Sequence, residues 1–249
     1  MKKIAVFNVT ARCDSACGFC FGPETIIDNQ KLITNAEKST VVLKKIIKKL
    51  YKNGTRVLVF TGGEPLLRQD IWELIEFAKR LGMFTALHTN GLLLSRKFKM
   101  QKSKCKMTIQ NSKLLREKIK FLDQINLPLD GYDEKTNDAM RGKGHLRAVM
   151  GVLRGLKGLP IRVIISTVAT AQNAKNVPKI GKILPKWIYK WRVFQFKAQG
   201  KARQVRREFE LTDREFKKIK QKILRLKPEF HIQCVSAKDK EFWRSYKIT

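Results

Sequence analysis

The stretch ARCDSACGFCFG, residues 11–22, decides how the rest of this sequence is interpreted. It places Cys13, Cys17 and Cys20 in a Cys-x3-Cys-x2-Cys spacing, among glycines that disfavour regular structure. Cysteine thiolates are the protein ligands of iron–sulfur clusters. Three such ligands leave one iron of a four-iron cube open, and an open metal position is typical of a catalytic site. We therefore predict a [4Fe–4S] cluster on Cys13, Cys17 and Cys20.

Two other interpretations of these cysteines fit the sequence less well. A structural zinc site would need a fourth ligand, and no histidine or cysteine follows Cys20 within 60 residues. Core cysteines would not be flanked by Gly18 and polar residues. The other two cysteines, Cys105 and Cys234, stand alone. An odd count with no secretory signal argues against a disulfide framework, and we expect a cytoplasmic protein.

Short apolar runs alternate with segments of helical periodicity along the chain. Such βα units build a parallel sheet with right-handed crossovers, so we predict an α/β protein, a partial (β/α)6 barrel with its chemistry on the loops after the strands. The expected strands are 3–10, 56–61, 84–89, 124–129, 161–168 and 192–196. The expected helices lie between Asn35 (as cap) and Gly54, between Asp70 (as cap) and Gly82, and at 145–156, 177–184 and 212–226.

Two regions depart from this alternation. Residues 92–112 are rich in lysine and lack clean periodicity, so we expect an irregular basic insertion there. Residues 210–249 follow the last expected strand. We assign residues 1–209 to the barrel and residues 210–249 to a C-terminal helix and extension packing on it.

Further motifs follow the expected strands in a fixed order: Thr61-Gly62-Gly63-Glu64-Pro65, Thr89-Asn90-Gly91, Leu129-Asp130-Gly131 and the Arg141 of MRGKG. With the cysteines, this order resembles the radical S-adenosylmethionine (SAM) superfamily over most of the chain. The resemblance implies that Gly62, Gly63, Glu64 and Pro65 form the turn that binds the SAM amino group. It also implies that the rest of the SAM site is formed by Asn90, Asp130, Arg141 (at the carboxylate), Ser166 or Thr167 (at the ribose) and Gln195 (near the adenine).

The resemblance also implies a reaction. SAM bound to the reduced cluster is cleaved to a 5′-deoxyadenosyl radical, which abstracts a hydrogen atom from a substrate. The electron would come from a donor of the ferredoxin or flavodoxin type. The cofactors carry this chemistry while the protein binds and orients, so no catalytic side chain is expected beyond the cofactor ligands.

Two branches of the superfamily compete. The segment RVFQF at 192–196 and the charged C-terminal part resemble viperin-like nucleotide enzymes, although Ile164 stands where those have a phosphate-binding lysine. Gln199-Gly200-Lys201-Ala202 resembles a turn of the molybdenum-cofactor and peptide-maturing branches. Those branches usually carry a cysteine-rich extension, and Cys234 alone follows residue 105 here, which gives too few ligands for an auxiliary cluster.

The charge of the chain points to polyanions. It carries 53 Lys and Arg against 21 Asp and Glu, a net charge of +32. A phosphorylated or nucleotide substrate, or RNA, would be attracted strongly, although a generally lysine-rich proteome would give the same composition. An RNA-modifying radical SAM enzyme is therefore one alternative, and a basic RNA-binding or redox module with a non-catalytic cluster is another. No uncharged apolar run of about 18 residues occurs, so we expect no membrane partner.

Overall fold

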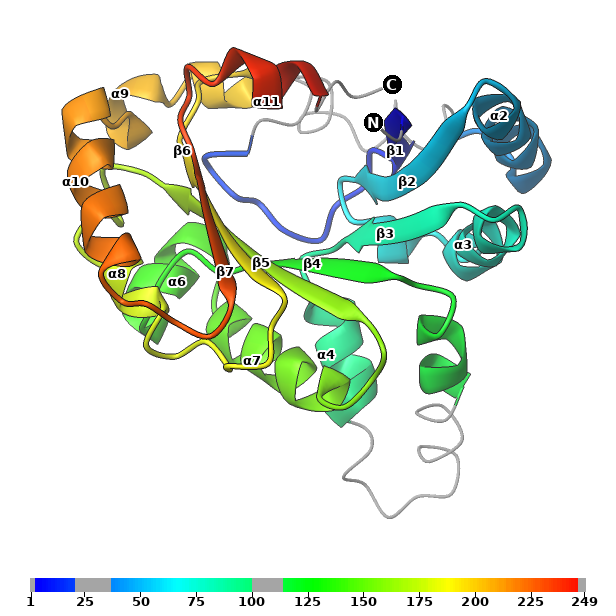
Figure 1. Cartoon of the computed structure of the whole chain (residues 1–249), viewed down its shortest axis with the longest axis horizontal. Coiled ribbons are helices and arrows are strands. Elements are labelled where there is room, and N and C mark those ends of the chain that lie inside the picture. Colours follow the sequence, from blue (N-terminus) through cyan, green and yellow to red (C-terminus); the bar gives the residue numbers. More distant parts are fainter. Residues whose placement is uncertain (1–2, 21–36, 100–113, 246–249) are drawn as a thin grey trace.

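The structure is a computed structural model that describes residues 3–20, 37–99 and 114–245. Within these residues, the framework is a sheet of seven parallel strands whose spatial order is their order along the chain (Figure 1). The strands are β1 (Lys3–Thr10), β2 (Thr55–Gly62), β3 (Phe84–His88), β4 (Gln124–Pro128), β5 (Arg162–Ala169), β6 (Lys190–Gln195) and β7 (His231–Val235). All of them end at the same edge of the sheet, which is where loops can converge on a site.

Helices join consecutive strands and cover the outer face of the curved sheet (Figure 1), except α11, which follows the last strand and packs against Phe194. Residues 114–119 are also helical, and short 3-10 turns η2 (Pro65–Leu67) and η4 (Gly200–Arg203) follow β2 and β6. The main core lies between the sheet and these helices. The helices are α2 (Thr40–Lys52), α3 (Ile71–Arg80), α4 (Leu92–Lys99), α6 (Glu134–Arg141), α7 (His145–Leu156), α8 (Val177–Ile180), α9 (Arg206–Phe209), α10 (Asp213–Leu224) and α11 (Lys240–Ser245).

The expected partial barrel is confirmed, with one correction at its C-terminal end. The extension does more than pack on a six-stranded barrel, because it contributes β7, which pairs in parallel with β6. Its helix α10 buries Phe216, Ile219 and Ile223 in the same core as the other helices. The extension and the barrel therefore share one sheet and one core.

The starts of two helices differ from the prediction. The first helix begins at Thr40, and Ser39, whose hydroxyl accepts from the Val42 N–H, is its N-cap. Asn35, the expected cap, lies outside the described residues. Asp70 does precede α3, but its side chain makes no capping hydrogen bond. It accepts hydrogen bonds from Arg68 and Thr40 instead. A residue typical of caps therefore connects the start of α2 to the loop before α3.

The prediction of an irregular segment from residue 92 is wrong for residues 92–99, which form α4. Leu94 and Phe98, four residues apart, are buried and hold this helix against the core. The ring of Phe98 packs over Gly155 of α7, where a larger residue would overlap it. The intervening basic side chains hide this spacing in the sequence. The rest of the expected insertion, with Cys105, lies outside the described residues.

The two faces of the sheet have different characters. Along β6, Trp191, Val193 and Gln195 are buried on the helix side, and Lys190, Arg192 and Phe194 alternate with them on the inner face. A small apolar cluster of Val6, Val59 and Ala86 fills the inner face near β1 to β3. Polar side chains therefore concentrate on the inner face of the later strands. Within the described residues, no helix is long and apolar enough to cross a membrane.

Candidate functional site

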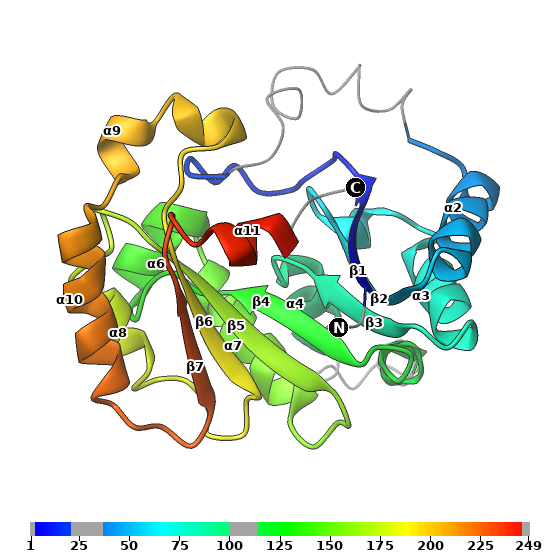
Figure 2. The ribbon, with the colours of Figure 1, turned by 45° about the horizontal axis from the view of Figure 1, so that its top comes forward.

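The three cysteines lie on residues 11–20, here called the cysteine segment, which leave β1 at the carboxyl edge of the sheet. The segment runs across that edge from β1 toward the region of α9 (Figure 2). Cys13 and Cys20 are exposed and Cys17 is half-buried, and all three are free thiols. A backbone hydrogen bond of 3.2 Å from the Cys20 N–H to the Cys17 carbonyl turns the chain between them. The segment therefore presents its thiols where the loops after the other strands converge.

The Gly62–Gly63 turn lies directly against the start of this segment. The Gly63 N–H donates to the Thr10 carbonyl at 2.9 Å, and the Glu64 N–H donates to the Arg12 carbonyl at 2.7 Å. A methyl group on Gly63 would overlap the Arg12 carbonyl, and one on Gly62, whose φ is +147°, would overlap that of Thr10. The backbone of the cysteine segment itself thus requires glycine at both positions, a reason that the sequence did not reveal.

Glu64 is buried and faces the protein interior. Its carboxylate accepts hydrogen bonds from the Leu66 N–H at 3.0 Å, the Thr89 hydroxyl at 2.8 Å and the Asn90 N–H at 2.7 Å. Burial raises the pKa of Glu64 to about 7, although these hydrogen bonds act in the opposite direction. Pro65, also buried, begins η2. The carboxylate therefore fixes the turn after β2 to the turn after β3.

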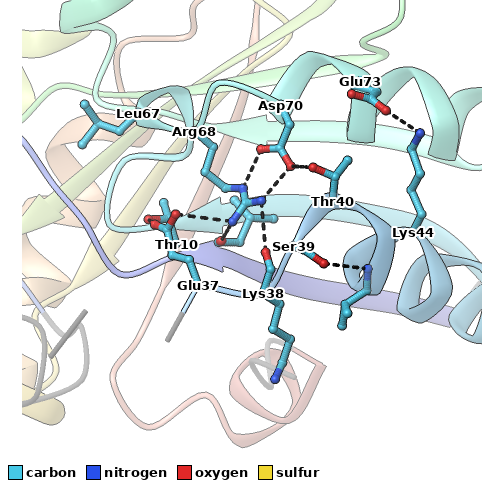
Figure 3. Close-up of polar contacts among 12 residues, drawn as sticks. Thr10, Glu37, Lys38, Ser39, Thr40, Lys44, Leu67, Arg68, Asp70 and Glu73 are labelled. Atoms are coloured by element: carbon cyan, nitrogen blue, oxygen red, sulfur yellow. Dashed lines mark hydrogen bonds and ion pairs between the residues drawn. The ribbon is translucent and has the colours of Figure 1, made fainter. Parts of the chain in front are cut away.

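A charged cluster ties the start of the segment to the chain that returns from it. The Arg68 guanidinium, whose side chain is 6% exposed, binds both oxygens of Asp70 and donates to the carbonyls of Val9 and Lys38 (Figure 3). Glu37 accepts from Thr10 and from Arg12, the latter at 2.9 and 3.1 Å, and lies 3.5 Å from Arg68. These contacts join β1, residues 37–40 and the start of α3.

Asn90 also contacts the cysteine segment. Its side-chain amide donates to Asp14 at 2.6 Å and to the Ser15 hydroxyl at 3.1 Å, while its oxygen accepts from the Leu92 N–H. The turn after β3 thus holds the segment between its first and second cysteines. Asn90 was predicted to bind SAM, and the observed contacts of its side chain are with the cysteine segment and the start of α4.

Asp130 and Arg141 form a buried ion pair beneath Cys17. Asp130 is 0% exposed and also accepts from the Val168 N–H at 2.6 Å, which fixes its carboxylate. Arg141, at the end of α6, donates to the Cys17 sulfur at 3.7 Å, and its guanidinium carbon lies 4.7 Å from the centroid of the Phe19 ring. These two predicted site residues therefore meet each other and one of the three cysteines.

The structure separates the candidates on β5 and β6. Ser166 lies on the inner face and donates to Asn126 at 2.8 Å. Thr167 is buried on the helix side, where it donates to the Leu129 carbonyl and accepts from the Trp191 indole, so it does not reach a ligand on the inner face. Of the two residues considered for the ribose, only Ser166 is suitably placed.

Gln195 does not fit its predicted role beside an adenine. Its nitrogen donates to the Leu211 carbonyl and to Asp213, and its oxygen accepts from the Ser236 hydroxyl and the Ala237 N–H. All four hydrogen-bonding positions of the amide are thus occupied by protein groups. Gln195 instead joins the end of β6 to α10 and to the residues after β7.

The far end of the cysteine segment rests in an aromatic cluster. Phe19 packs against Phe209 at a ring distance of 5.8 Å, and Phe209 packs against Phe196 at 5.9 Å. Met140 and Ala202 complete the cluster, and Cys17 packs against it. Ala202 belongs to the Gln199–Ala202 turn, which thus lies beside the segment. Phe196 was expected near the adenine with Gln195 and lies in this cluster, whereas Phe209 was not predicted, because no local motif marks it.

The donor set suits an iron–sulfur cluster. Partial desolvation raises the pKa of Cys13 to about 11, although its side chain keeps some exposed surface, and burial raises that of Cys17, so metal binding would release protons from these thiols. Among the residues described, no three His, Cys, Asp or Glu side chains are close enough to hold a single metal ion. Thiolates of a four-iron cluster need not meet that criterion, because each binds a different iron of the cube.

The sequence that forms this site matches the model of a known family. The model of the Radical SAM superfamily matches residues 7–180, which include the three cysteines and the turns after β2, β3 and β4. The chain therefore belongs to the radical SAM superfamily. This is an enzyme class whose cofactors are a [4Fe–4S] cluster and SAM.

Several relatives have names that describe different reactions. The Fe-coproporphyrin III synthase of Methanosarcina barkeri is 32% identical over 184 residues, 74% of this chain and 41% of that protein. The S-adenosylmethionine-dependent nucleotide dehydratase of Lacinutrix mariniflava is 28% identical over 222 residues, 84% of this chain and 42% of that protein. This chain thus spans less than half the length of either relative.

Among solved structures, SuiB of Streptococcus suis bound to SAM has the same fold. Its TM-score is 0.65 and its sequence identity 18%, over 94% of this chain and 50% of that one. The same protein bound to its precursor peptide SuiA gives a TM-score of 0.67. At this identity the similarity establishes the fold alone.

Proposed function

We propose that this chain is the catalytic core of a radical SAM enzyme that cleaves SAM reductively and abstracts hydrogen from an anionic substrate. The observation that carries the proposal is the convergence of the turns after β2 and β3 and of the Asp130–Arg141 pair on the cysteine segment. The turn after β2 bonds to its backbone, Asn90 bonds to its side chains, and Arg141, held by Asp130, contacts Cys17. Motifs that are far apart in the sequence therefore form one site.

In this proposal Cys13, Cys17 and Cys20 hold the cluster. The backbone of Gly62–Pro65 binds the SAM amino group, while Arg141 and Ser166 contact its carboxylate and ribose. The chemistry that the bound cofactors supply is the one-electron reductive cleavage of SAM. The protein's share is to hold the segment in one geometry and to keep the inner face of the barrel polar enough for a substrate.

The inner face of the later strands supports an anionic substrate. Ser166 of β5 lies opposite Arg192 of β6 in the sheet register. Two residues earlier on each strand, Ile164 lies opposite Lys190. Burial and the charge of Arg192 lower the pKa of Lys190, and the same two effects lower the pKa of His88 to about 3. The positive charges of Lys190 and Arg192 thus lie near each other on the inner face of the barrel. A negatively charged substrate group bound there would offset their repulsion.

The relatives are compatible with that substrate class. One is named for a nucleotide and another for a coproporphyrin, and both kinds of compound carry anionic groups. An RNA substrate would satisfy the same charge, and the electron donor would be of the ferredoxin or flavodoxin type. The basic residues on the inner face favour an anion.

The test is anaerobic reconstitution with iron and sulfide, addition of dithionite and SAM, and detection of 5′-deoxyadenosine by mass spectrometry. We expect product from the wild-type chain and none from Cys17→Ala, because that variant lacks a cluster ligand. Cys234→Ala is the matched control, since Cys234 is part of β7 and lies beside residues of α10, outside the proposed site. It should retain full cleavage.

Two results would contradict the proposal. Formation of 5′-deoxyadenosine by Cys17→Ala would show that Cys17 is not a ligand of the cluster. A reducible wild-type cluster that never cleaves SAM, even with CTP, UTP or total tRNA present, would favour the basic RNA-binding or redox module instead.

A further inference from the structure

Arg141 occupies an unusual place beside the proposed cluster ligands. One end of its guanidinium donates to the Cys17 sulfur at 3.7 Å, while its Nε is paired with Asp130 on the opposite side. Its side chain is 16% exposed. A permanently charged group is therefore held against one of the three cysteine sulfurs with little water between them.

Two contacts and the packing of the neighbouring Met140 keep this guanidinium in place. Asp130 is anchored in turn by the Val168 N–H, so it is a fixed partner. The Phe19 ring, buried in the aromatic cluster, stacks on the guanidinium. Arg141 itself follows Met140, which packs in that same cluster at the end of α6. The contact with the sulfur is thus a property of the fold and not of one mobile side chain.

A donor at a cluster sulfur changes the energy of reduction. Reduction adds one negative charge, part of which resides on the ligand sulfurs, and a hydrogen bond or positive charge there stabilises the reduced state. The effect is greatest where water is excluded. The negative charge of Asp130 has the opposite effect on reduction. The guanidinium lies between Asp130 and Cys17, so the positive group is nearer to the sulfur and its effect dominates.

We propose that Arg141 sets the reduction potential of the cluster, raising it through the Cys17 sulfur. This inference rests on the proposed function, because it presumes a cluster on the cysteine segment. It is separate from the expected contact between Arg141 and the SAM carboxylate. Arginine has five N–H donors, so those that do not face Asp130 and Cys17 can serve that contact.

The experiment measures the potential of the reconstituted cluster without SAM, by redox titration followed by electron paramagnetic resonance. The variants are Arg141→Met and Arg141→Lys, and Arg147→Met is the control. Arg147 is an exposed arginine on α7, paired with Glu134, so its loss changes the total charge equally. We expect a more negative potential in Arg141→Met, a smaller shift in Arg141→Lys and none in Arg147→Met.

The outcomes separate this inference from the proposed function. Iron and sulfide content is measured first, and failure of the wild-type chain to take up four irons would refute the cluster itself. If clusters assemble and Arg141→Met has the wild-type potential, the inference is overturned, whatever the change in SAM affinity. If Arg141→Met cannot be loaded, Arg141→Lys decides: a negative shift supports the inference, and an unchanged potential overturns it.

Discussion

The cysteine segment is held at its two ends by different kinds of interaction. At its start, Arg12, Glu37, Arg68 and Asp70 form a connected set of ion pairs around the backbone of β1. At its far end, Phe19 lies in an aromatic cluster, and a single ion pair, Asp130–Arg141, stands beside it. The first end depends on charge and the second mainly on apolar packing.

The partners of the two ends also differ in how far they lie from the cysteines along the sequence. The partners at the start lie within the first 70 residues, close to the motifs that identify the site. The partners at the far end come from α6, η4 and α9, which follow β4 and β6. The start can therefore be weakened without the far end, and two variants and one change of pH should do so, in the following order of decreasing effect.

The largest effect is expected from Arg68→Met. The change leaves Asp70 and Glu37 without their shared cation and the carbonyls of Val9 and Lys38 without their donor. Breaking a buried ion pair from one side costs about 3–5 kcal/mol of unfolding free energy. Denaturant unfolding measures it, with Arg80→Met as the control. Arg80 forms an exposed pair with Glu76 on α3, so its loss should cost about 0–1 kcal/mol. Equal losses in both variants would mean that the Arg68 cluster contributes no special stability.

A smaller loss of stability is expected from Gly63→Ala. The new methyl group must push the Arg12 carbonyl away, and such overpacking costs about 1–3 kcal/mol. Because Arg12 lies at the start of the cysteine segment, next to Cys13, we expect cluster uptake and SAM binding to fall together. The control is Gly151→Ala on α7, where the nearest atom, Ser95 Oγ, is 3.5 Å from the new carbon. Normal iron content with loss of SAM binding alone would show instead that Gly63 serves only to admit the ligand.

The smallest effect is expected from mild acid, which should loosen the first end before the second. Burial opposes ionisation of Glu37 and Asp70, but the hydrogen bonds and charges of Arg12, Arg68, Thr10 and Thr40 lower the pKa of each carboxyl below its ordinary value of 4.5 or 3.8. A lowered pKa stabilises the fold at higher pH, and this stability is lost as the pH falls below those values. Hydrogen exchange should therefore show early loss of protection in peptides covering 3–12 and 37–44. Simultaneous loss in a peptide covering 196–211 would contradict the distinction between the two ends.

Much of the fold was predictable because apolar runs and helical spacing are local signals. The helix α7 has the predicted bounds, and each of the six expected strands is present within about two residues of its prediction. The strand β7 was missed because it is an edge strand with four partly or fully exposed residues, so HIQCV lacks a clear apolar run. The helix α6 was missed because only Asn137 and Met140 of its eight residues are buried.

The site was predictable only where a motif is continuous in sequence. Local turns marked Gly62–Pro65, Asn90 and Asp130, whereas their contacts with the cysteine segment needed the fold. The sequence already contained a signal against placing Gln195 beside the adenine. It has the same parity along β6 as Trp191 and Val193, which indicates the helix-side face. Arg68 carried a weaker signal, an Arg-x-Asp pair just after the glycine turn, and Phe209 carried none.

The match between strand order and chain order also has a consequence for synthesis of the protein. The ion-pair groups that fix the start of the cysteine segment have left the ribosome once Asp70 emerges, and Asn90 follows soon after, but the far end needs Phe209. At about 5–20 residues per second, roughly 7–30 s separate these two events. During that interval the nascent chain carries three thiols tethered at one side only. Delivery of iron and sulfide is therefore best matched to the time after Phe209 has emerged, when both sides of the cysteine segment can be held.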